Sequence, residues 1–270
     1  LVQNGSSGAN GQNNITVQNL NVLSTGSSTL AQYGGWLGQA YYSKGASNNL
    51  IRGCMSNGII SLSSGGICGQ YSGGNNLNIE YCYSTGTLDN YAGGICGAYS
   101  CYGLNIIINY CYSTGSIGIS AGGIIGFYSG NNNGYCKVSN SFSLGNIDTF
   151  SGGIFAHECG TNITDPSKGC YAENCYSRGT VGGLGGGIFG YFCGTSNGKV
   201  SAVNCYMLGG GTIFGASSQN TVETNCYAAG GTWSKSTADA ALTGEPASGQ
   251  YVGTTWATLD PNITTTPYIL

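Results

Sequence analysis

Thirteen cysteines are the residues of this 270-residue chain whose type and spacing most readily suggest chemistry. Thiols form disulfides, bind metals and act as nucleophiles. Six cysteines recur at one position of an internal repeat: Cys54, Cys82, Cys111, Cys175, Cys205 and Cys226. Val22 and Ser141 hold this position in two further repeats, and neither residue can form a disulfide. We therefore predict that this cysteine ladder mainly fills space in a core and keeps its thiols reduced.

The remaining cysteines divide into two groups. Cys68 and Cys96 begin a second ladder, which large apolar residues continue in later repeats. Five others lie in the parts of the repeat that vary in length: Cys101, Cys136, Cys159, Cys170 and Cys193. Whether these five form disulfides is left open, because spacing alone does not determine which cysteines pair. Oxidation there would indicate an extracellular or virion setting.

A catalytic site would need acidic, basic or nucleophilic side chains that converge. The ten Asp and Glu residues are dispersed, and no position of the repeat holds an acid repeatedly. His157 and Cys159 alone are too few for a zinc site. The densest ionisable group lies in and beside the longest insertion: His157, Glu158, Asp165 and Lys168. We predict no enzyme activity, no catalytic residue, no metal and no cofactor.

Aromatic residues follow the cysteine ladder directly. The tyrosines among them are Tyr83, Tyr112, Tyr176, Tyr206 and Tyr227. If the segment is a strand, alternation places these side chains on the face opposite the cysteines. Two interpretations stay open: an exposed strip that binds glycans or a partner, or aromatic packing beneath the variable loops or within a core.

Asparagine occurs in two patterns. One forms a partial ladder just before the cysteine position, and we expect it to hydrogen bond at a turn: Asn140, Asn174, Asn204 and Asn225. The other is the glycosylation sequence Asn-x-Ser/Thr, at Asn4, Asn14, Asn162 and Asn262. Such sequences arise by chance in a chain rich in Asn, Ser and Thr, and they matter only if the protein meets the glycosylation machinery.

Charge and composition exclude two classes of function. Formal net charge is −3, and only seven Lys or Arg residues are spread along the chain, so we predict no nucleic-acid partner. No apolar run approaches the roughly 18 residues of a membrane span. Fifty residues are glycine and 6 % are charged, yet 40 % are hydrophobic, which favours a folded, turn-rich chain over a disordered one.

The elements that position these side chains follow from a repeat of about 29 residues. A Gly-Gly anchor starts at Gly34, Gly65, Gly93, Gly122, Gly152 and Gly186. It lies 12 residues after the ladder position in the first repeat and 11 residues after it in the next five. Helical and leucine-rich repeats are disfavoured, because apolar runs are short, rich in β-branched or aromatic residues, and bounded by Gly, Ser and Asn.

We therefore predict an all-β chain: a right-handed parallel β-helix of about seven to eight coils with a C-terminal cap. Residues 1–19 would form a polar lead-in, residues 20–232 the solenoid and residues 233–270 the cap. A cap is expected because a solenoid exposes unpaired strand edges at its ends.

The paired motifs, Asn-Cys-Tyr-Ser-x-Gly at 174–179 and Gly-Gly-Ile-x-Gly at 186–190, resemble the GLUG-type repeats of bacterial surface proteins. They are still more similar to repeat proteins of giant DNA viruses that infect amoebae, and the tail after residue 232 is similar to the end of those proteins. The resemblance covers about residues 20–270 and implies a structural protein on an extracellular or virion surface. Ser141 and the shortened repeat at Cys205 depart from the pattern.

The sequence is compatible with two functions. The first is a non-enzymatic structural solenoid that forms a fibre, filament or virion surface layer by association with copies of itself. The second is an adhesin-like module that binds host glycans or a receptor through its tyrosines and variable loops.

Overall fold

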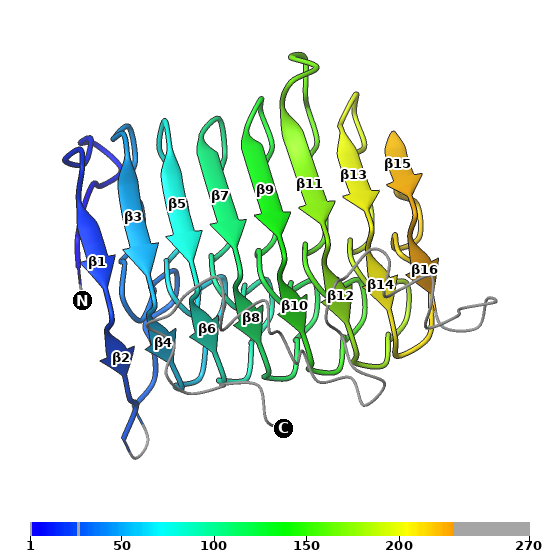
Figure 1. Ribbon diagram of the computed structural model, residues 1–270, viewed down its shortest axis with the longest axis horizontal. Coiled ribbons are helices and arrows are strands. Elements are labelled where there is room, and N and C mark those ends of the chain that lie inside the picture. Colours follow the sequence, from blue (N-terminus) through cyan, green and yellow to red (C-terminus); the bar gives the residue numbers. More distant parts are fainter. Residues whose placement is uncertain (1, 26–27, 229–270) are drawn as a thin grey trace.

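A computed structural model describes residues 2–25 and 28–228, which form a parallel β-solenoid (Figure 1). The predicted fold class is confirmed, with two parallel sheets of eight strands each. No helix of the described part is long and apolar enough to cross a membrane. The predicted C-terminal cap at 233–270 lies outside the described residues.

Each coil supplies one longer strand to the first sheet and one two-residue strand to the second. The first sheet contains β1 (Thr16–Gln18), β3 (Asn49–Arg52), β5 (Leu77–Glu80), β7 (Asn105–Asn109), β9 (Tyr135–Ser139), β11 (Gly169–Glu173), β13 (Val200–Val203) and β15 (Thr221–Thr224). The second contains β2 (Asn21–Val22), β4 (Met55–Ser56), β6 (Tyr83–Ser84), β8 (Tyr112–Ser113), β10 (Phe142–Ser143), β12 (Tyr176–Ser177), β14 (Tyr206–Met207) and β16 (Tyr227–Ala228).

Register is kept from coil to coil in the first sheet. Ile79 pairs with Ile108, and Ile108 with Val138, and all three side chains are fully buried. Residues between them on the same strands point outward, as alternation requires. Equivalent side chains therefore stack along the axis, and the core is a set of ladders inside the coil.

Single bridges close the third side of the coil, where the Gly-Gly anchors lie. The first glycines of successive anchors pair with one another from Gly65 to Gly186, and Gly65 also pairs with Gly35, the second glycine of the first anchor. A Cβ on Gly94 would lie 2.0 Å from the carbonyl oxygen of Gly123 in the next coil. Only glycine permits this approach, which explains the fixed spacing of the anchor.

Three assignments made from the sequence pattern need correction. The solenoid begins before residue 20, because β1 lies within the expected lead-in and Val2 bridges Gly38. Pairing of Asn21 with Met55 places Leu20, not Val22, opposite Cys54. In the first coil, Gly35 is the glycine that pairs with Gly65. Extra residues between β2 and this anchor shift the register, and the sequence pattern conceals the shift.

Candidate functional site

The cysteine ladder is buried at the bend between the two sheets. Cys54, Cys82 and Cys111 have no exposed surface, and all thirteen cysteines are free thiols. The backbone N–H of Cys54 donates to Cys82 Sγ at 3.4 Å, and Cys82 N–H donates to Cys111 Sγ at the same distance. Each thiol donates in turn to the carbonyl two residues before it, as Cys82 does to Glu80 at 3.2 Å. The sulfurs therefore satisfy buried backbone donors, a role beyond the space filling predicted from sequence.

Ser141 takes the same part with oxygen in place of sulfur. Its hydroxyl accepts the N–H of Cys111 at 3.1 Å and donates to the Ser139 carbonyl at 2.7 Å. What this ladder position requires is a small side chain that both accepts and donates a hydrogen bond. This requirement explains why serine replaces cysteine in one coil.

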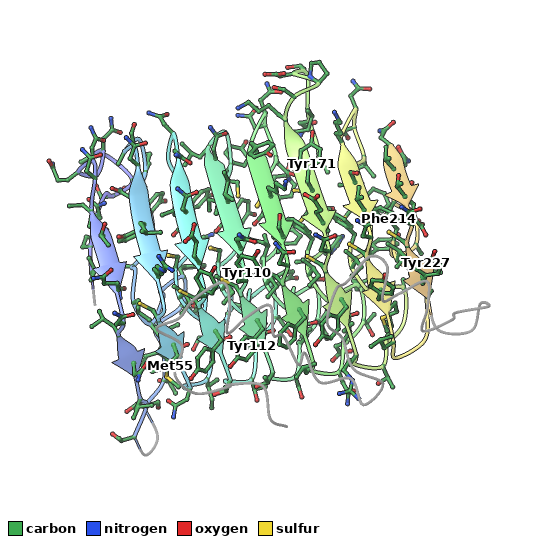
Figure 2. The ribbon with its side chains drawn as sticks, viewed as in Figure 1. Met55, Tyr110, Tyr112, Tyr171, Phe214 and Tyr227 are labelled. Atoms are coloured by element: carbon green, nitrogen blue, oxygen red, sulfur yellow. The ribbon has the colours of Figure 1, made fainter. Side chains whose placement is uncertain are left out.

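The tyrosines after the ladder form a stack of rings in a cluster separate from the cysteines, and Figure 2 labels Tyr112 and Tyr227 among them. The ring centroids of Tyr83 and Tyr112 lie 4.7 Å apart, and Phe142 continues the stack at 4.9 Å. Tyr112, Tyr176 and Tyr206 are at most 4 % exposed, whereas Tyr83 and Tyr227 are half-buried. Of the two interpretations left open, aromatic packing therefore holds for the three buried tyrosines, and an exposed strip does not. Neighbouring rings cover each other's faces, so those faces are not open to a sugar.

The predicted asparagine ladder is confirmed. Each side-chain amide donates to the side-chain oxygen of the previous coil, from Asn174 to Asn140 at 3.1 Å and from Asn204 to Asn174 at 3.0 Å. All three have positive φ, between 49° and 52°, which asparagine tolerates better than most residues. The ladder fixes the turn before each cysteine.

Part of the ionisable group converges into a geometry that resembles a hydrolase triad. His157 Nδ1 lies 3.1 Å from Ser120 Oγ, and its Nε2 lies 3.6 Å from Glu158 Oε1. The rings of Phe127, Phe150 and Tyr191 surround the imidazole at centroid distances of 5.3 to 5.9 Å. Burial lowers the pKa of His157 and raises the pKa of Glu158.

This geometry lacks two requirements of acyl transfer. Ser120 is 3 % exposed, so a substrate cannot reach its hydroxyl in this conformation. The N–H groups of Ser120, Ala121 and Gly122 all donate to carbonyls, so they do not offer an oxyanion hole. The remaining members lie elsewhere: Asp165 accepts from Ser167, and Lys168 donates to Asn105. Within residues 2–25 and 28–228, no three His, Cys, Asp or Glu side chains form a metal site.

A second aromatic ladder on the third side of the coil was missed by the sequence reasoning. Tyr41, Tyr71, Tyr99 and Tyr128 are half-buried, and the ring centroids of successive pairs lie 5.1, 5.0 and 5.3 Å apart. All four have φ between 55° and 63°. Their separations of 30, 28 and 29 residues are a signal that the sequence contains.

A shallow polar depression lies on the outer face of the first sheet. Its sides are formed by Tyr135, Lys137 and Glu173, together with Asn140 and Asn174 of the asparagine ladder. Lys137 Nζ and Glu173 Oε2 form an ion pair of 2.7 Å, and the hydrogen bond to Glu173 raises the pKa of Lys137. Tyr171, labelled in Figure 2, packs against Tyr135 with the two rings tilted by 40° and their centroids 5.4 Å apart. Carboxylate, ammonium, amide and aromatic groups are therefore close together and accessible here.

The four candidate glycosylation residues differ in accessibility. Asn4 is only 6 % exposed, and its side chain is hydrogen bonded to the backbone of Gln12 at 2.7 and 3.2 Å. A glycan on Asn4 is incompatible with this packing. Asn14 and Asn162 are exposed, and Asn262 lies outside the described residues.

Comparison of the chain with protein families, curated proteins and solved structures gave no match. The likeness to GLUG-type and giant-virus repeats therefore stays a prediction.

Proposed function

We propose that this chain is a non-enzymatic structural β-solenoid that associates with copies of itself. In this proposal it forms part of a fibre, filament or surface layer, on a virion or outside the cell, as the resemblance implies. The observation that carries the proposal is the strand at the end of the last described coil, whose outer edge pairs with no other described strand. β15 pairs with β13 alone among the described strands, and all four of its residues are exposed.

The hydrogen-bond pattern of β15 indicates which groups a second copy would meet. The carbonyl of Asn220 accepts from Val200 of β13 at 3.5 Å, and the carbonyl of Thr224 accepts from Asn204, directly after β13, at 2.9 Å. Because backbone direction alternates along a strand, Thr221 and Glu223 direct their N–H and C=O groups to the other side. No described strand lies there. Such an edge is a template for the strand of another chain.

The described shaft supports a structural role more than a catalytic one. Its regular positions are occupied by groups that bond to the next coil, as the cysteine and asparagine ladders do. The Ser120–His157–Glu158 group is closed to substrate and lacks an oxyanion hole. The features that repeat from coil to coil are contacts between neighbouring coils. A second copy placed end to end would make contacts of the same kind.

Proline at Thr221 tests the proposal. T221P removes an N–H on the open edge without removing a bond to β13, and we expect it to lower the association constant at least about tenfold. T221V keeps the N–H and should associate like the original chain. Sedimentation velocity over a range of concentrations measures this. Equal association of the two variants, or a monomer at every concentration, would contradict the proposal.

A second candidate is favoured by the depression beside Lys137 and Glu173. It offers the polar groups and the aromatic surface that glycan recognition uses, and it replaces the buried tyrosine strip as the location of an adhesin-like site. A glycan array with the original chain tests it, with K137A and Y171A as loss variants. Y33A, which changes a tyrosine 45 % exposed on another side, is the control. No binding on the array, or equal loss in all three variants, would exclude this site.

A further inference from the structure

Cys101 occupies a position where four other coils hold glycine and the first coil holds Ser43. The N–H groups of Gly73, Cys101, Gly130, Gly160 and Gly194 all donate to the preceding coil at equivalent points, at 2.9 to 3.0 Å. All five have positive φ, and that of Cys101 is 59°. A side chain in this left-handed region is disfavoured relative to glycine. The backbone conformation therefore does not favour a cysteine at this position, so the reason for it must come from an interaction of its side chain.

The side chain of Cys101 meets one particular partner. Its Sγ lies 2.6 Å from Sγ of Cys136, and both residues are fully buried. Two sulfurs in simple contact stay much further apart, whereas a disulfide joins them at about 2.05 Å. Cys136 stands in register with Ile106, at a core position where other coils hold aliphatic residues or Cys170.

The hydrogen bonds of these two thiols also differ from those of the ladder. Cys82 and Cys175 donate to carbonyls two residues before them, at 3.2 and 3.3 Å. Within the described part of the chain, Cys101 and Cys136 contact each other and have no carbonyl acceptor, and the Cys136 thiol also meets the Cys170 thiol. Of these contacts, the one between Cys101 and Cys136, at 2.6 Å and without a carbonyl acceptor for either thiol, is placed for oxidation.

We propose that Cys101 and Cys136 form a disulfide that links two neighbouring coils. With a small-molecule disulfide such as oxidised glutathione as oxidant, one thiolate attacks it and releases one glutathione thiol. The second cysteine thiolate then displaces the other glutathione. Cys101 and Cys136 together lose two protons and two electrons, one S–S bond forms in the protein, and the oxidant becomes two thiols.

Refolding the full chain from urea in a glutathione redox buffer tests the assignment, because both thiols meet the reagent before burial. After trapping with N-ethylmaleimide and proteolysis, mass spectrometry should find a peptide pair joined through Cys101 and Cys136. Eleven thiols should react in denaturant, which is the thirteen of the chain less two. Thirteen reactive thiols, or Cys136 joined to Cys170 instead, would overturn the proposal.

C101G is the decisive variant, since glycine occupies the equivalent position in four other coils. It should fold, form no cross-link and unfold at the same urea concentration with and without reductant. The original chain should unfold at a higher concentration when oxidised than when reduced. C170V is the matched control, because Val200 holds the register position next to Cys170, and it should keep the cross-link. An equal response of C101G and the original chain to reductant would refute the bond.

Discussion

At the scale of single residues, the cysteines serve two different purposes. Those of the ladder accept a backbone N–H from one coil and donate to a carbonyl of their own coil, as Cys82 does. The hydroxyl oxygen of Ser141 makes the same two hydrogen bonds as a ladder thiol. Cys101 and Cys136 have neither partner and face each other instead. Cysteine content alone therefore says little about oxidation, because the hydrogen-bond partners distinguish the two roles.

Replacing Cys82 separates hydrogen bonding from packing. C82S should destabilise the chain by less than about 1 kcal/mol, because the hydroxyl keeps both bonds. C82A leaves the buried N–H of Cys54 without an acceptor, and we expect a loss of about 3 kcal/mol when the cavity is included. Urea unfolding measures both values. If the two variants are equally stable, the ladder acts by volume alone.

His157 should make stability depend on pH. Burial lowers its pKa in the folded chain, so the unfolded chain binds the proton more tightly. Stability should therefore fall as pH drops below the ordinary histidine value of about 6.5 and continue to fall towards the lower folded pKa. H157Q should lose less stability than the original chain over this range. Glu158, whose pKa is raised by burial, is present in both chains, so it does not cause the difference between them. If urea unfolding gives the original chain and H157Q the same dependence of stability on pH, His157 is not its cause.

At the scale of elements, the turns and the Gly-Gly anchors determine the coil. The anchors allow backbones of adjacent coils to touch, and the asparagine ladder holds the bend before each short strand. From the coil of Cys54 to that of Cys175, variation in repeat length is confined to loops after the anchor, whereas the first coil and the coil of Cys205 also vary between the ladder and the anchor. The strands themselves are short, so register depends on the turns as much as on strand pairing.

Gly94 tests the role of the anchor. G94A would place a Cβ 2.0 Å from the Gly123 carbonyl oxygen, and we expect it to lower the free energy of unfolding by about 3 kcal/mol. G8A is the control, because nothing lies within 4 Å of a Cβ there. Thermal or urea unfolding should show a change within about 0.5 kcal/mol for the control. A tolerated G94A would mean that the coils separate more easily than the packing suggests.

At the scale of the whole molecule, the sequence predicted the fold well because its signals are periodic. Constant spacing between cysteine and glycine anchors required one coil per repeat, and the register of Ile79, Ile108 and Val138 confirms it. Periodicity could not fix the first coil, where an insertion hid the alignment of Leu20 with Cys54.

The candidate sites were harder to predict, for physical reasons. Alternation placed Tyr112 and Tyr176 opposite the cysteines, yet it does not reveal what covers a face, and both proved buried. The contact between Cys101 and Cys136 depends on a left-handed residue whose side chain turns inward, which no spacing reports. The Lys137–Glu173 pair joins strands 36 residues apart and follows only from register.

Electron microscopy of the purified full chain, imaged across a range of concentrations, tests the central claim of a self-associating solenoid most directly. The account predicts rods that lengthen in steps of one solenoid as concentration rises, with a spacing of about 4.8 Å between strands along the rod. It also predicts that T221P shortens these rods while T221V does not. Single, separate particles of constant length at every concentration would contradict it.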